Sequence, residues 1–147
     1  MKDLTISTGL TEYRLNDRVT VSFNPTDVVF LERLTQTLEK LDALQEELNA
    51  ARGTLDEADI FPFAKEQDKK MRAVLDALFD VPVCEALFGS LNLYASAGGF
   101  PVWANLIFAV YEEAETAMQG ELSAREQRIA KYVEKYKQPS QTGKAVC

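Results

Sequence analysis

The sequence contains no histidine among its 147 residues. Histidine is the usual general base near neutral pH, a common zinc ligand, and the residue that activates serine and cysteine nucleophiles. Its absence excludes the usual zinc sites and the Ser–His and Cys–His pairs of nucleophilic catalysis. Carboxylate or lysine chemistry stays open, but the absence favours a protein that is not an enzyme and that holds no metal and no cofactor.

Cysteine is scarce as well. The chain has Cys84 in its middle and Cys147 at its end, and these two do not make a disulfide framework. A reducing cytoplasm is the simplest location for such a chain. Cys84 lies near a predicted helix start, where the pKa of a thiol is lowered, but no histidine is present to activate it. We therefore interpret Cys84 as a small buried hydrophobic residue.

No hydrophobic run is long enough to cross a membrane. The longest apolar stretch, residues 100–111, is interrupted by Pro101 and Asn105 and is shorter than the about 20 residues that a transmembrane helix needs. Residues 1–4, MKDL, lack the apolar stretch of a signal peptide. The sequence therefore predicts a protein that is not associated with a membrane.

Positive charge is in deficit, with 16 Lys and Arg against 23 Asp and Glu and a formal net charge of −7 at pH 7. An acidic surface repels the phosphate backbone of nucleic acids and anionic lipid headgroups. The densest basic cluster, residues 69–72, is diluted by neighbouring acidic residues. We therefore expect neither nucleic acid nor membrane as a partner.

The acidic residues form two clusters, at residues 56–59 and 112–115. The first lacks the ligand spacing and the central glycine of an EF-hand calcium loop. The second would need Glu-x-x-His pairs to build a di-metal site inside a helical bundle. We interpret both clusters as solvated charges at helix ends.

Hydrophobic residues make up 46% of the chain, which is typical of a globular domain and argues against wholesale disorder. A domain of this length buries about two thirds of its unfolded surface, so a hydrophobic core can form without a disulfide or a metal. We expect a single domain over residues 1–137. Residues 138–147 begin QPSQTG, are small, polar and rich in helix breakers, and predict a disordered tail.

Residues 1–23 predict a β-hairpin. Polar and apolar residues alternate over residues 18–23 and around Tyr13 and Leu15, which is typical of strands with one buried face. Asn16-Asp17 lies between the two stretches as a turn signal, and a third strand over residues 3–7 would extend the sheet. A lone hairpin is barely stable in water, so its apolar face must lie on helices or on a partner.

The remaining residues predict a helical bundle of four to five helices, so the fold class is mainly α, with α+β character from the hairpin. Asn24, with Pro25 at the first helical position, begins the first helix, and Gly53 ends it. The second helix begins near Pro62, or at Asp56 as an alternative cap. The expected helices are residues 25–52, 62–79, 84–88, 101–120 and 123–137.

Two of these helices offer apolar surfaces that either bind another polypeptide or pack in the core. Leucines recur at spacings of three and four along the first helix, and the helix from Pro101 is apolar on most sides. Aromatic residues at element ends act as binding anchors unless the core uses them. The last helix has its own apolar face of Ile129, Tyr132, Val133 and Tyr136. The candidate partner-binding residues are Leu31, Leu34, Leu38, Leu41, Leu48, Phe100, Trp103 and Leu106.

The order of the segments and their amino-acid sequences resemble those of a known family. The hairpin leads to VSFNPTD at 21–27 and a Leu-rich helix, and then come AKEQDKKMR at 64–72, FDVPVCEALFG at 79–89 and PVWANL at 101–106. This arrangement, over residues 12 to 137, resembles the tail assembly chaperones encoded by long-tailed phages and prophages of Gram-positive gut bacteria. It contains no catalytic motif.

The resemblance implies a non-enzymatic chaperone in the cytoplasm of a bacterial host. Such chaperones coat the long, helical tape-measure protein, keep it soluble, help to recruit tail tube subunits and are absent from the finished virion. Many are made in two lengths by a ribosomal frameshift, and a tail after Lys137 fits the short form. An exposed apolar stripe is stabilised when another molecule covers it, so we expect a homo-oligomer.

Two other functions stay open. The chain is alternatively a phage or mobile-element inhibitor that binds a host defence protein through an acidic surface resembling nucleic acid, which calls for regular, closely spaced, exposed carboxylates. It is alternatively a structural tail component, such as a tube-terminating or connector protein, which would be present in purified virions. An enzyme would need a preformed pocket with convergent carboxylates.

Overall fold

The computed structural model describes the backbone of residues 1–146 and the side chains of residues 1–135. The protein is mainly helical with an N-terminal hairpin, as the sequence predicts. The predicted disordered tail, residues 138–147, lies outside the residues whose side chains are described. The elements in chain order are β1 (Thr11–Leu15), β2 (Val19–Phe23), α1 (Val28–Arg52), α2 (Glu57–Phe79), α3 (Val83–Phe88), β3 (Ser96–Ala97), β4 (Phe100–Pro101) and α4 (Val102–Val146).

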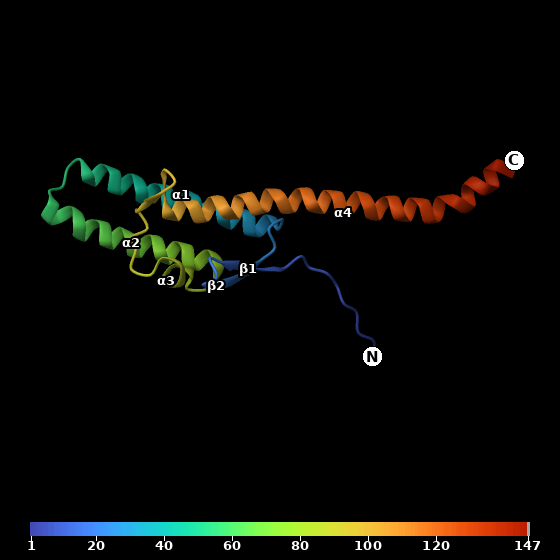
Figure 1. Cartoon of the computed structure of the whole chain (residues 1–147), viewed down its shortest axis with the longest axis horizontal. Coiled ribbons are helices and arrows are strands. Elements are labelled where there is room, and N and C mark those ends of the chain that lie inside the picture. Colours follow the sequence, from blue (N-terminus) through green and yellow to red (C-terminus); the bar gives the residue numbers. More distant parts are fainter. Residues whose placement is uncertain (147) are drawn as a thin grey trace.

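The three long helices form the body of the protein. Helices α1 and α2 lie side by side in opposite directions, and α4 runs along α1 and then continues past the body as one long helix (Figure 1). The N-terminal residues leave the body in an extended segment near the same end (Figure 1). Only the first part of α4 is therefore held by the body.

The predicted hairpin is confirmed, including its turn. Strands β1 and β2 pair antiparallel with Leu15 opposite Val19. Of the three residues between them, Asn16 and Asp17 have φ angles of 50° and 55°, as the central residues of a type I′ turn require, and the N–H of Arg18 donates to the carbonyl of Leu15. The expected third strand at residues 3–7 is wrong, because residues 1–10 are exposed and form no strand.

The apolar face of the hairpin packs on helices, as expected for so small a sheet. The ring of Phe23 stacks on Tyr13 at 4.5 Å and on Phe30 of α1 at 4.4 Å between centroids. Phe79 at the end of α2 lies 6.1 Å away, and Val21 is buried beside them. The alternation of residues 18–23 thus becomes one buried and one exposed face.

The first helix begins three residues later than expected. Asp27 caps α1 by accepting a hydrogen bond from the backbone of Val29 at 3.0 Å. Asn24 instead caps the preceding turn, where it accepts from the backbone of Thr26 at 2.8 Å. Both residues are good caps, and the Asn24–Asp27 turn decides between them. Gly53 ends the helix as predicted.

The second helix begins at the alternative cap. Asp56 accepts from the backbone N–H of Asp59 at 3.1 Å, so α2 starts at Glu57 and the start near Pro62 is wrong. Pro62 lies inside the helix, where it lacks the N–H that would bond to the carbonyl four residues before. The helix ends at Phe79, as predicted, with Asp80 in the left-handed conformation.

The expected break between a fourth and a fifth helix is absent within the described residues, because α4 continues through Gly120 and Ser123. A glycine inside a helix costs only about 1 kcal/mol relative to alanine, so it does not have to end one. The stretch before α4 also holds a second hairpin that was not predicted. Gly98 and Gly99, with φ angles of 64° and 90°, join β3 to β4.

The core lies where the three long helices meet. The leucine repeat of α1 supplies its centre, because side chains three and four residues apart lie on one face of a helix. Helices α2 and α4 cover this face. The buried side chains include Leu34, Leu41 and Leu48 from α1, Met71 and Leu75 from α2, and Ile107 and Val110 from α4.

Hydrogen bonds fasten the start of α4 to α1. The indole Nε1 of Trp103 donates to Oε1 of Gln45 at 2.9 Å. Just before the helix, the hydroxyl of Tyr94 donates to the carbonyl of Leu44 at 3.1 Å. These two bonds, together with the core, fix the direction in which α4 leaves the body.

Candidate protein-binding surface

The most exposed regular element of the molecule is the outer part of α4. Every residue from 118 to 135 is exposed, and this stretch projects beyond the body (Figure 1). We call residues 118–135 the arm. A helix without tertiary contacts has to rely on its own propensity, which is marginal for about 12 to 15 residues in water. The arm therefore has the form of an element that gains stability when something packs against it.

The arm carries large apolar side chains on one face. Successive positions 118, 122, 125, 129 and 132 alternate in steps of four and three, which is the spacing of a coiled-coil seam. Arg125 is the polar member of this series. We call the four apolar members of the series and the adjoining Val133 the arm stripe. These residues are 42–54% exposed and are Met118, Leu122, Ile129, Tyr132 and Val133.

A groove at the base of the arm continues this apolar face onto the body. Leu31 of α1 and Phe108, Tyr111, Ala114 and Met118 of α4 form its apolar lining, and glutamate and glutamine side chains of α4 form its rim. Its volume is about 690 Å³, enough for several side chains of a partner helix. Met118 belongs to both the groove and the arm stripe, so the two make one continuous surface.

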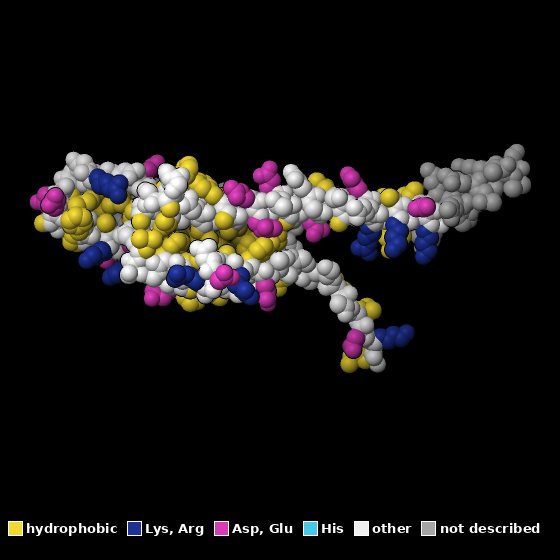
Figure 2. Space-filling model, in the orientation of Figure 1, with side chains coloured by type: hydrophobic (Ala, Val, Ile, Leu, Met, Phe, Trp, Pro, Cys, Tyr) yellow, Lys and Arg dark blue, Asp and Glu magenta, His cyan; other side chains and the backbone are white. Residues whose placement is uncertain are grey.

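Charge is segregated along α4. Residues 112–121 contain four Glu and no Lys or Arg, whereas residues 122–135 contain four Lys and Arg against two Glu. Figure 2 shows acidic side chains on the part of the helix nearer the body and basic side chains gathered farther out. The guanidinium of Arg128 lies 5.9 Å from the ring centre of Tyr132. The arm is thus the basic end of a protein that is acidic as a whole.

Most of the predicted partner-binding residues lie in the core instead of on a surface. Leu34, Leu41, Leu48, Trp103 and Leu106 are buried. The reason is physical, because the leucine repeat of α1 finds its partners in α2 and α4 of the same chain. In this conformation these five side chains cannot contact another molecule.

The other three predicted residues keep some exposure. Leu31 and Leu38 are half-buried against the core, and Leu31 lines the groove. Phe100 is 51% exposed and packs edge-on against Phe108, with ring centres 5.1 Å apart. Leu31 is therefore the one predicted residue that belongs to the continuous surface of groove and arm.

The arm stripe was not among the predicted binding residues. The sequence does show Ile129, Tyr132 and Val133 as an apolar face, but the expected break at residues 120–123 separated them from Met118. The three-and-four spacing from Met118 to Tyr132, in which Arg125 is the one polar member, is the signal that could have revealed it.

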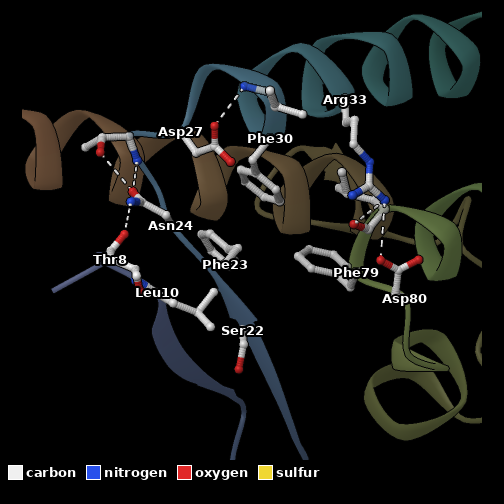
Figure 3. A pocket seen from close by; sticks show the side chains of 13 residues that line it. Thr8, Leu10, Ser22, Phe23, Asn24, Asp27, Phe30, Arg33, Phe79 and Asp80 are labelled. Atoms are coloured by element: carbon white, nitrogen blue, oxygen red, sulfur yellow. Dashed lines mark hydrogen bonds and ion pairs between the residues drawn. The ribbon is translucent and has the colours of Figure 1, made fainter. Parts of the chain in front are cut away.

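A second cavity, of about 720 Å³, lies between the end of β2, the start of α1 and the end of α2. Figure 3 shows that its polar side chains bond to one another and to nearby backbone. Arg33 donates to the carbonyls of Ala77 and Leu78 at 2.7 and 3.1 Å. The amide of Asn24 donates to the carbonyl of Thr8 at 2.8 Å. These groups hold the end of α2 and the N-terminal segment in place, so the cavity has a structural explanation.

Three side chains of the body have raised pKa values, each mainly because of burial: Tyr13, Cys84 and Tyr94. Cys84 is buried, which agrees with its interpretation as a small hydrophobic residue. Burial and then the nearby Asp76 raise the pKa of its thiol. A protonated, buried thiol is a poor nucleophile.

Within residues 1–146, no helix combines the length and the hydrophobicity needed to cross a membrane. No three Cys, Asp or Glu side chains of the described part lie together in a way that could hold a metal ion. Comparisons of the chain with known protein families, with curated proteins and with solved structures found no match.

Proposed function

We propose that this protein is a non-enzymatic phage tail assembly chaperone, which binds amphipathic helices of the tape-measure protein and keeps that protein soluble in the host cytoplasm. The observation that carries the proposal is the continuous apolar surface formed by the groove and the arm stripe. The resemblance over residues 12 to 137 supplies the identity of the client. Tail tube subunits are further partners under the same proposal.

The surface suits a helical client better than a polar loop. Each side chain of the arm stripe is about half exposed, so covering one contributes about 1 kcal/mol. The five together contribute about 5 kcal/mol, while association costs about 4 to 15 kcal/mol. A client must therefore bring an apolar stripe of its own, as an amphipathic helix does. The resulting contact is modest in strength, which fits a chaperone that has to leave before the tail is finished.

The charge of the protein supports the same function. A net charge of −7 makes copies bound along one client repel one another at their outer surfaces, which keeps the complex dispersed. The apolar stripe lies on a stretch of α4, residues 118–135, where four basic residues stand against three acidic ones. The arm stripe would thus bind the client, while the acidic surface of the rest of the protein would keep the complex soluble.

The test is co-expression with a tape-measure protein of a long-tailed phage. Wild-type protein should raise the soluble yield of the client and should co-purify with it. The variant Leu122→Asp/Ile129→Asp places two charges in the arm stripe and should lose both effects. Its matched control, Ala124→Asp/Ala130→Asp, adds the same charges to the same helix away from the stripe and should keep them.

No change in client yield and no co-purification with the wild-type protein would refute the chaperone function. Equal client yield and equal co-purification with the two variants would show that the arm stripe is not part of the binding site. Capture of a host nuclease in place of the client would support the inhibitor function, and retention of the protein in purified virions would support a structural tail component.

A further inference from the structure

We propose that two copies of this chain pair through their arms in antiparallel orientation, with Met118 of one copy facing Ile129 of the other. The pair covers the same surface that would bind the client, so it is the state of the protein without client. The proposal holds whether or not that client is a tape-measure protein. It assigns a partner, an orientation and a register to the arm stripe.

The spacing of the arm stripe points to a helix as the occupant. Positions 118, 125 and 132 alternate with positions 122 and 129 as the two seam positions of a heptad repeat. The apolar members of this seam are exposed along the whole arm. A second helix laid along the seam covers them in successive layers, which a compact ligand cannot do.

The segregation of charge selects the orientation. A parallel pair would place the acidic stretch 112–121 beside its own copy and the basic side chains of 125–135 beside theirs. An antiparallel pair places each acidic stretch beside the basic stretch of the other copy. The charge pattern of residues 112–135 is therefore complementary to itself when one copy is reversed, which argues for a second copy of this chain as the partner.

The register follows from the side chains that flank the seam. When Met118 faces Ile129 of the second copy, Leu122 faces Arg125, and Glu121 lies beside Arg128 in both halves of the pair. Shifting one copy by seven residues in one direction brings Arg128 beside Arg128. Shifting it in the other direction brings Glu121 beside Glu121. Like charges in these positions are unfavourable, so only one of the three registers pairs opposite charges.

The polar member of the seam fits this arrangement. Arg125 can lay its aliphatic part against Leu122 of the second copy and keep its guanidinium in water, as long basic side chains do at apolar surfaces. The layer beside it, between Met118 and Ile129, is apolar. The two layers at the centre of the pair thus each contain one Arg125, and the guanidinium of each stays in water, so the pairing buries no charge.

The groove completes the interface. In the same register, Tyr132 of the second copy falls opposite Glu115, at the edge of the groove lined by Phe108 and Tyr111. The tip of each arm thus covers the base of the other. The paired stretch from Glu112 to Lys135 is about 36 Å long at 1.5 Å per residue, which is long enough for several seam layers.

The first experiment measures the mass of the full chain by sedimentation equilibrium without any client. The chain has a mass of 16.4 kDa, and we expect twice this mass at micromolar concentration. Leu122→Asp/Ile129→Asp should be monomeric, and Ala124→Asp/Ala130→Asp should remain dimeric. Wild-type protein that stays monomeric up to high concentration, or a higher oligomer unaffected by the arm variants, would overturn the proposal.

Charge reversal tests the register. Glu121→Arg and Arg128→Glu each turn two attractive contacts of the dimer into two repulsive ones, so each should weaken dimerisation about tenfold. The double variant should restore it. Residues 121 and 128 are about 10 Å apart along one helix, so such rescue requires contact between copies. Failure of the double variant to recover would refute this register.

Spin-label distances test the orientation. Labels are attached to Ser123→Cys or Ala130→Cys in a Cys147→Ser background, which leaves Cys84 buried. In the antiparallel pair, the two copies of position 123 lie nearly level along the helix axis, whereas those of position 130 are offset by about 20 Å. Similar short distances at both positions would indicate a parallel pair and contradict the proposal. The charge-reversal variants leave the arm stripe intact, so loss of dimer and loss of client binding can be told apart.

Discussion

Replacing Arg72 by methionine tests how the body holds the start of α4. The guanidinium of Arg72 lies 2.9 Å from the carboxylate of Asp68, and the two side chains are only 18% and 15% exposed. It also donates to the carbonyls of Gly89 and Leu91 at 2.7 Å each. The other carboxylate oxygen of Asp68 accepts from the backbone N–H of Leu93 at 2.7 Å. The ion pair lies within α2, and the hydrogen bonds of its two side chains therefore join α2 to the loop that leads into α4.

The expected loss of unfolding free energy in Arg72→Met follows from the carboxylate and carbonyl groups that this variant leaves without a partner. Methionine keeps most of the aliphatic volume, but the carboxylate of Asp68 loses its cation while it stays mostly buried, which typically costs about 3 to 5 kcal/mol. The two carbonyls lose their donor but lie near the surface, where water can replace it. We therefore expect a loss of about 3 kcal/mol in the free energy of unfolding for Arg72→Met.

Urea denaturation followed by circular dichroism measures this loss. The matched control is Lys69→Met on the same helix, which removes an exposed ion pair of 3.7 Å with Glu66. Exposed pairs contribute little, so the control should change the free energy of unfolding by less than about 0.5 kcal/mol. A loss below about 1 kcal/mol for Arg72→Met, or equal losses in the two variants, would refute the assigned role of the ion pair.

Three further predictions concern the arm, the core and the pH dependence of stability. Gly120→Ala should stabilise the arm helix by about 1 kcal/mol, since the space around Gly120 is open, and should slow amide hydrogen exchange there; faster exchange would contradict a continuous helix. Leu41→Asp should prevent folding, because Leu41 is fully buried, whereas Leu38→Asp should leave a folded protein with reduced stability, as thermal denaturation can show. Burial, and then the nearby Glu47, raise the pKa of Tyr94 from 10.0 to about 12. The native state therefore keeps this proton where the unfolded state loses it, so stability is full below pH 10 and falls by about 2 kcal/mol as pH rises to 12; a Tyr94→Phe variant should fall less over the same range, and an equal fall would refute the assignment.

Local signals in the sequence predicted where most elements begin and end. The Asn16-Asp17 turn, Gly53 and Asp80 each end a strand or helix because their backbone preferences act over a few residues. Asn24 and Asp27 compete as caps for one helix, and only the turn between them decides which is used. Gly120 shows the opposite case, since a residue that disfavours a helix does not end one when its neighbours favour it.

The candidate site was harder to predict than the fold, because spacing shows that a face is apolar and not what covers it. The repeat through Leu34, Leu41 and Leu48 and the repeat through Leu122 and Ile129 look alike in the sequence. The first is covered by α2 and α4 of the same chain, and the second is exposed because the body ends before it. That difference depends on contacts between residues far apart in sequence, which a local pattern does not contain.

Site-specific photo-crosslinking in cells that assemble phage tails tests most directly whether the arm stripe is a contact surface. A photoreactive phenylalanine analogue is placed at Ile129, in the stripe, or at Ala130, one residue away on the outer side of the helix. We predict that the probe at position 129 crosslinks to the tape-measure protein or to a second copy of this chain, and that the probe at position 130 gives little product. Equal crosslinking from the two positions, or none from position 129, would contradict the central claim.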